Sequence, residues 1–142
     1  MNRVQRLLIA STLSATLVAA VPASADIAVV VNAGSGIDRL TRSDVVNIFM
    51  GRYRKLPTGN VALPVDSSSL KARFYRALVD KDLAEINSYW ARLVFSGEAS
   101  PPQQIVSIGD VHQLVIQNMN ALGYVDSSQV PADMHVVLTL SE

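Results

Sequence analysis

Apolar and polar residues follow two different periods along this chain. Continuous apolar runs of strand length predict buried strands, and apolar residues spaced three or four positions apart predict amphipathic helices. The predicted strands cover residues 27–31, 61–65, 105–108, 123–125 and 134–140. The predicted helices cover residues 42–50, 69–79, 83–95 and 111–120. Taken in order, β-α-β-α-α-β-α-β-β, these elements indicate an α/β domain with helices packed on a mixed sheet.

Polar residues at the predicted helix ends are typical capping residues. Thr41 followed by Asp44, and Asp82 followed by Glu85, fit the capping box, in which two side chains accept hydrogen bonds from backbone N–H groups at the helix start. Asp110 is a candidate cap for the last helix. We therefore expect these helices to begin directly after their caps.

Three aromatic residues lie on the predicted helix 83–95: Tyr89, Trp90 and Phe95. Aromatic residues at helical spacing usually fill a packed face of the helix. We therefore expect all three side chains in the hydrophobic core.

The first 25 residues differ in composition from the rest of the chain. Two arginines precede an uncharged apolar run of about 15 residues, which is shorter than the roughly 20 that a membrane span needs. The run ends in Ala23-Ser24-Ala25, which fits the A-x-A pattern of signal peptidase sites. We therefore predict a signal peptide over residues 1–25, cleaved before Asp26, and a single periplasmic or secreted domain over residues 26–142.

Charge and cysteine content exclude several classes of function. The chain has 12 basic and 12 acidic residues, and because residues 1–25 contain two arginines and no acid, residues 26–142 have a formal net charge of −2. We therefore expect no nucleic-acid partner and no membrane insertion after cleavage. The chain has no cysteine, which excludes disulfides, thiolate metal sites and a cysteine nucleophile.

A run of three serines precedes one predicted helix. Ser67, Ser68 and Ser69 stand at its start, and Lys71 follows in the first turn. The backbone N–H groups and the partial positive charge of a helix N-terminus attract anions. Two interpretations stay open: one serine caps the helix while the others are solvated, or the hydroxyls and Lys71 bind an anion.

A second group of cations lies in the predicted loop 51–60. Arg52 and Arg54 flank Tyr53, and Lys55 follows. Short charge runs are usually solvated surface. The alternative is that Arg52 and Arg54 contact an anion or a protein partner.

No motif of an enzyme or of a metal site is present in the sequence. His112 and His135 are isolated, and neither belongs to an H-E-x-x-H pattern. The segment Gly34-Ser35-Gly36 lacks the third glycine of the dinucleotide fingerprint, and no G-x-S-x-G elbow occurs. We therefore expect no catalytic residues, no metal and no cofactor.

Six segments match a known family pattern. The most specific is Ile48-Phe49-Met50-Gly51-Arg52, which fits an I-F-x-G-[KR] helix end after a strand that ends in V-N. The matching segments are 29–32, 40–45, 48–52, 65–74, 88–97 and 123–125. Together they resemble the later lobe of phosphate-type periplasmic solute-binding proteins, including short, single-lobe members of that superfamily.

The resemblance implies both a fold and a function. It implies a single three-layer α/β lobe of class II periplasmic-binding-protein type, which is not an enzyme and is linked to phosphate uptake or sensing through an ABC transporter. The family's S-G-T helix start falls on Ser68-Ser69-Leu70, so an apolar side chain stands in place of the threonine. Asp66 lies near the position of a family arginine, and a carboxylate there repels phosphate unless it is protonated or paired.

Two hypotheses for function follow from the sequence and the resemblance. The first is recognition of phosphate or another small oxyanion by Ser67, Ser68, Ser69 and Lys71. The alternative is an accessory module that kept the fold, lost the ligand and contacts an ABC transporter membrane component or another envelope protein. A single lobe leaves a bound anion half exposed to water, where charge interactions are weak. A homodimer or a second protein would therefore have to complete the cleft.

Overall fold

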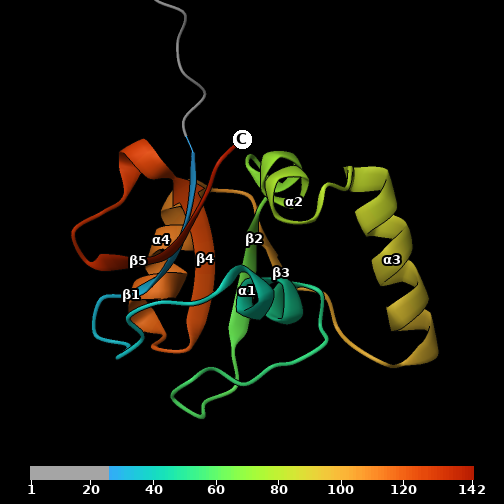
Figure 1. The fold of residues 1–142 in the computed structure, drawn as a ribbon, viewed down its shortest axis with the longest axis horizontal. Helices are drawn as coiled ribbons and strands as arrows, with labels where there is room; N and C mark the ends of the chain where they lie inside the picture. Colours follow the sequence, from blue (N-terminus) through green and yellow to red (C-terminus); the bar gives the residue numbers. More distant parts are fainter. Residues whose placement is uncertain (1–25) are drawn as a thin grey trace, which may run out of the picture.

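Residues 26–142 form a five-stranded sheet with helices on both faces in the computed structural model, which describes these residues (Figure 1). The predicted signal peptide, residues 1–25, lies outside the described residues. None of the helices in the described part is long and apolar enough to span a bilayer.

The sheet is mixed, with strand order β3-β2-β4-β1-β5. Strand β2 runs parallel to β3 and β4, whereas β1 is antiparallel to β4 and β5. The three parallel strands therefore share one carboxyl end and one amino end. The strands are β1 (Ile27–Asn32), β2 (Leu63–Ser67), β3 (Gln103–Ile105), β4 (Ala121–Asp126) and β5 (Met134–Leu140).

Helices cover both faces of the sheet. Helix α4 lies on one face, α1 and α2 lie on the other, and α3 packs outside α2 (Figure 1). The architecture is therefore a three-layer α/β lobe, as predicted. The helices are α1 (Arg42–Phe49), α2 (Lys71–Val79), α3 (Leu83–Ser96) and α4 (Ile108–Gln117), with a short 3-10 helix, η1 (Ser127–Gln129), before β5.

Two hydrophobic clusters hold the layers together, one on each face of the sheet. Val29 and Val31 of β1 belong to the cluster with α1 and α2, whereas Ala28 and Val30 belong to the cluster with α4. Successive side chains of a strand point to opposite faces. A strand covered on both sides is therefore apolar at every position, which explains the continuous apolar run in the sequence.

The predicted order of elements is confirmed, and so are two helix starts. Thr41 accepts from the backbone N–H of Asp44, whose side chain accepts in return from Thr41 N–H. Asp82 and Glu85 form the same reciprocal pair at the start of α3. Local sequence is therefore sufficient to place these two helices.

The boundaries of several other elements differ from the prediction. Strand β2 covers residues 63–67 instead of 61–65, and β3 covers residues 103–105 instead of 105–108. Helix α4 begins three residues earlier than predicted because Ser107, and not Asp110, is its cap.

Phe95 is also wrongly predicted, because its side chain is 96% exposed. Helix α3 packs inward through Ile86 and Trp90, its two buried residues. At about 100° per residue, position 95 lies on the side of the helix opposite Ile86. The core prediction holds for Trp90, and Tyr89 packs at the edge of the same cluster.

Candidate functional site

The serine loop, residues 67–69, lies at the carboxyl end of the parallel strands and leads from β2 into α2. The N-cap residue of α2 is Leu70, and no side chain caps the helix. A serine cap is therefore wrong for this helix. Among the described residues, the backbone N–H groups of Ser69, Lys71 and Ala72 have no hydrogen-bond partner.

The structure separates the three serines. Ser67 is fully buried, and its hydroxyl lies 3.3 Å from that of Ser69. Ser68 and Ser69 are exposed, and the Ser68 N–H donates to the carbonyl of Ile105. Ser69 is therefore an exposed residue beside the helix N-terminus whose N–H has no hydrogen-bond partner among the described residues.

A buried carboxylate lies directly beneath the serine loop. Asp66 is 1% exposed and accepts hydrogen bonds from the hydroxyls of Tyr75, at 3.0 and 3.1 Å, and of Tyr124, at 3.0 Å. The Gln104 amide donates to the same carboxylate at 2.9 Å, and the Lys71 ammonium lies 4.0 Å from it. We call these five residues the Asp66 network.

Burial and hydrogen bonds act in opposite directions on Asp66. Desolvation is the largest effect and raises the pKa of Asp66 above its ordinary 3.8, while the bonds from Gln104 and Tyr75, the charge of Lys71 and the bond from Tyr124 lower it. Burial beside this carboxylate raises the pKa of both Tyr75 and Tyr124, so both remain protonated donors. The network is therefore a set of donors already occupied by the protein's own acid.

A second set of charges surrounds the start of α2. Arg73 pairs with Glu142 at 2.6 Å and lies 3.8 Å from Asp126. The bond from Arg73 lowers the pKa of Glu142, and bonds from Ser128 lower that of Asp126. Asp126 also lines a hollow of about 200 Å³ beside Ser69. Both cations near this helix start, Lys71 and Arg73, thus face carboxylates of the same chain.

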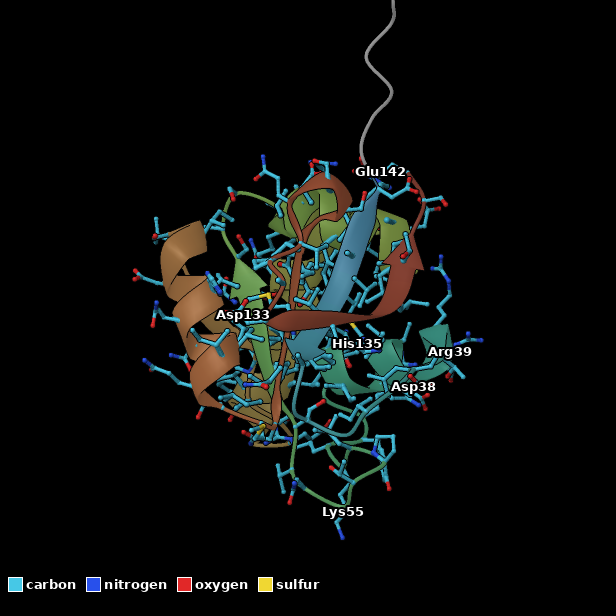
Figure 2. The ribbon with its side chains drawn as sticks, turned by 90° about the vertical axis from the view of Figure 1, so that its left-hand side faces the viewer. Asp38, Arg39, Lys55, Asp133, His135 and Glu142 are labelled. Atoms are coloured by element: carbon cyan, nitrogen blue, oxygen red, sulfur yellow. The ribbon has the colours of Figure 1, made fainter. Side chains whose placement is uncertain are left out.

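Arg52 and Arg54 lie at the opposite end of the parallel strands and are not brought to the serine loop. Figure 2 shows the separation: Lys55, beside Arg54, lies at one end of the molecule, and Glu142, the partner of Arg73, at the other. Both arginine side chains are exposed, and Arg54 lines a cavity of about 240 Å³. The two predicted groups of cations are therefore two separate places.

The histidines lie away from both places. His112 pairs with Asp133 at 2.9 Å, and His135, near the start of β5 (Figure 2), bonds the carbonyl of Asp38 at 2.7 Å. In residues 26–142 no group of three or more His, Asp or Glu side chains is placed to hold a metal ion.

Sequence reasoning missed three residues of the Asp66 network: Tyr75, Gln104 and Tyr124. They come from α2, β3 and β4. Only the pairing register, in which Asp66 stands opposite Gln104, brings them together. A usable signal was the acidic residue at the end of an otherwise apolar strand, because a buried acid requires donors around it.

Solved structures resemble this fold, although no protein-family model and no curated protein matches the sequence. One is a Clostridium perfringens protein assigned as a phosphate ABC transporter substrate-binding protein, solved with bound phosphate (TM-score 0.63, 20% identity). Another is an ABC-type phosphate transport receptor from Vibrio cholerae (TM-score 0.62, 18% identity). Each match covers 81% of this chain but only 45% and 47%, respectively, of the other.

The matches agree with the architecture derived above. They span about half the length of the two transport proteins, and at this identity they establish the fold. The chain therefore has the fold of phosphate-type ABC transporter substrate-binding proteins, in the form of one α/β lobe.

Proposed function

We propose that this protein is an exported, non-enzymatic module of solute-binding fold that acts by contacting a protein partner and does not capture free phosphate at its serine loop. The Asp66 network carries this proposal. The hydroxyls of Tyr75 and Tyr124 and the amide of Gln104 donate to Asp66. Donors that are engaged by a buried carboxylate are not available to a second anion.

The surface around the serine loop supports a protein partner. Val106 is 81% exposed and Ile108 is 43% exposed, directly after the edge strand β3. The bond from Ser68 to Ile105 holds this apolar segment against the loop. Exposed apolar side chains beside an uncovered sheet edge are typical of contact surfaces. Similarity to ABC transport receptors supports an ABC membrane component or another envelope protein as the partner.

Calorimetric titration with phosphate tests the first half of the proposal. We expect no saturable heat when residues 26–142 are titrated with phosphate, or with sulfate as the control anion. Pull-down from an envelope extract tests the second half. We expect a partner that the unchanged protein captures and the Val106→Glu variant does not.

Control variants show whether a loss of capture is specific to the surface at Val106. Met119→Glu places the same charge on another exposed apolar residue, 56% exposed, and should leave capture unchanged. The double change Arg52→Ala and Arg54→Ala examines the cationic loop separately. Capture that survives Val106→Glu would show that the proposed contact surface is wrong, and capture lost only in the arginine variant would indicate contact through the cationic loop.

Recognition of phosphate is the second candidate, and one observation favours it. The unpartnered N–H groups of Ser69, Lys71 and Ala72 lie at the start of α2, and one protein of similar fold was solved with phosphate bound. Micromolar phosphate binding that is weakened by Ser69→Ala would support this candidate and overturn the first.

A further inference from the structure

A partly enclosed cavity of about 240 Å³ lies at the amino end of β2 and β3, far from the serine loop. Its apolar wall includes Ile48 of α1, Leu63 and Pro64 of β2, and Pro101. Pockets for drug-sized ligands measure roughly 300–1,000 Å³ and are mostly apolar with a few placed polar groups. This cavity is smaller, so it suits a small ligand with an apolar body.

The polar side chains of the cavity have no hydrogen-bond or ion-pair partner among residues 26–142. Arg54, Ser100 and Gln103 supply the polar lining, and in the described residues their side chains form no hydrogen bond or ion pair. No acidic residue lines the cavity. One unpaired guanidinium beside an apolar wall is complementary to an anion that has an apolar body.

The inner wall of the cavity depends on Gly51. Its φ is +71°, and an added Cβ would lie 2.7 Å from Cη2 of Trp90 and 3.1 Å from Cβ of Ala99. The backbone of Gly51 therefore packs directly against the Trp90 ring, and a larger residue requires the ring to shift. Trp90 is the only tryptophan of the chain and is 7% exposed, so its fluorescence reports on this wall.

We propose that this cavity binds a small organic monoanion with a compact apolar body, such as an aromatic or short-chain carboxylate. The guanidinium of Arg54 pairs with the carboxylate, the Ser100 hydroxyl and the Gln103 amide orient it, and the apolar body packs against Leu63 and Pro101. Guanidinium and carboxylate match in geometry, since two parallel N–H···O bonds join them.

This site goes beyond the proposed function and does not require it. It lies at the opposite end of the strands from the serine loop and uses different residues. Phosphate binding at the serine loop would overturn the proposed function and leave the cavity proposal untouched. Conversely, loss of the cavity proposal leaves the partner surface at Val106 unaffected.

Titration of residues 26–142 with benzoate and hexanoate, followed by calorimetry and by Trp90 fluorescence, tests the proposal. Small ligands gain a limited free energy per atom, so we expect a dissociation constant on the order of 1 mM or lower. Benzamide has the shape of benzoate without its charge, and we expect it to bind at least about tenfold more weakly, as the loss of an ion pair in a partly enclosed site implies.

Two arginine variants distinguish binding in the cavity from nonspecific electrostatic attraction of the anion to the cationic loop. Arg54→Gln should weaken benzoate binding about tenfold or more, which corresponds to the loss of one charge-assisted pair. Arg52→Gln removes an equal charge from the same exposed loop, outside the cavity lining, and should leave binding unchanged. Ser100→Phe places a large side chain at the exposed rim and should abolish the fluorescence change.

Three results would overturn the proposal. The first is absence of saturable binding of both carboxylates to the unchanged protein. The second is equal weakening by Arg54→Gln and Arg52→Gln, which would indicate attraction to the whole loop. The third is binding of benzamide as strong as that of benzoate.

Discussion

The cations at the two ends of the parallel strands differ in their ion pairing. At the carboxyl end, Lys71 lies beside the buried Asp66, and Arg73 pairs with Glu142. At the amino end, Arg54 lines an apolar cavity that has no acidic residue and has no ion pair of its own among the described residues. The sequence shows cations at both ends, and only the structure shows which of them are already neutralised.

This difference shows that the pairing of cations within the chain decides where an anion can bind. The number of cations alone does not locate such a site. Each charge near the helix start of α2 has a counter-charge on the same chain, so the helix N-terminus adds its donors to a site with little net positive charge. A fold that is similar to phosphate receptors can therefore carry an end whose cations are paired with carboxylates of its own chain. The following predictions alter one end at a time.

Gly51→Ala is expected to have the largest effect and acts on the amino end. The new methyl group would meet the Trp90 ring at 2.7 Å, on a backbone with φ of +71°. Left-handed strain and overpacking together should lower the free energy of unfolding by about 2–4 kcal/mol. Urea denaturation followed by Trp90 fluorescence measures this loss.

Gly59→Ala is the matched control for that change. Gly59 has φ of +87°, but nothing lies within 4 Å of an added Cβ. Only the backbone strain of about 1–2 kcal/mol should remain. Equal losses at the two positions would show that Trp90 does not pack tightly against Gly51, and the described cavity wall would be wrong.

Tyr124→Phe is expected to have the next largest effect and acts on the carboxyl end. The hydroxyl donates to Asp66 and accepts from the backbone N–H of Ser67, while the ring stacks on Phe74 at 3.8 Å. The substitution keeps the ring and removes both bonds, which should lower the free energy of unfolding by about 1–3 kcal/mol. The exposed Tyr53→Phe is the control, and a similar loss there would contradict the assigned role of the network.

Capping boxes show what could be predicted from the sequence. Thr41 with Asp44, and Asp82 with Glu85, are neighbours along the chain, so local sequence decides those helix starts. The run of strictly apolar residues 27–31 likewise predicts a strand buried on both faces. The order of elements followed from such local patterns.

The start of α2 shows what could not be predicted. Local sequence favours each of the three serines equally as a helix cap. The strand extends to Ser67 because Val65–Ser67 pairs with β3, and this pairing is not visible in the local sequence. The Asp66 network has the same origin, since its members are up to 58 positions apart and meet only through the sheet register. The sequence did show that a carboxylate at this position needs pairing or protonation, but not which groups provide it.

Stability should depend on pH through Asp66, a moderate effect at the carboxyl end. Burial raises the pKa of Asp66 in the folded state above 3.8. The stabilisation that protonated Asp66 provides is therefore fully present below pH 3.8. It is lost as the pH rises through the pKa of Asp66 in the folded state. As the pH rises above 3.8, we expect the urea midpoint to fall more steeply in the unchanged protein than in Asp66→Asn.

Other titrating groups do not produce that difference. The pKa values of Asp126 and Glu142 are lowered, by bonds from Ser128 and Arg73 respectively, so their contributions are lost only at lower pH. Every titratable group other than Asp66 is present in both proteins and cancels in the comparison. Identical pH profiles for the two proteins would mean that the network fully compensates the burial of Asp66.

Arg73→Gln is expected to have the smallest effect, because its ion pairs lie at the surface. The Arg73 side chain is 38% exposed and that of Glu142 is 20% exposed, so water and salt screen the pair. A double-mutant cycle of Arg73→Gln with Glu142→Gln should give a coupling of about 0.2–1 kcal/mol that decreases at high salt. The cycle also sharpens the contrast between the two ends. The coupling could instead be independent of salt and as large as the loss of stability in Tyr124→Phe. The surface pair would then stabilise the start of α2 as much as the buried Asp66 network does.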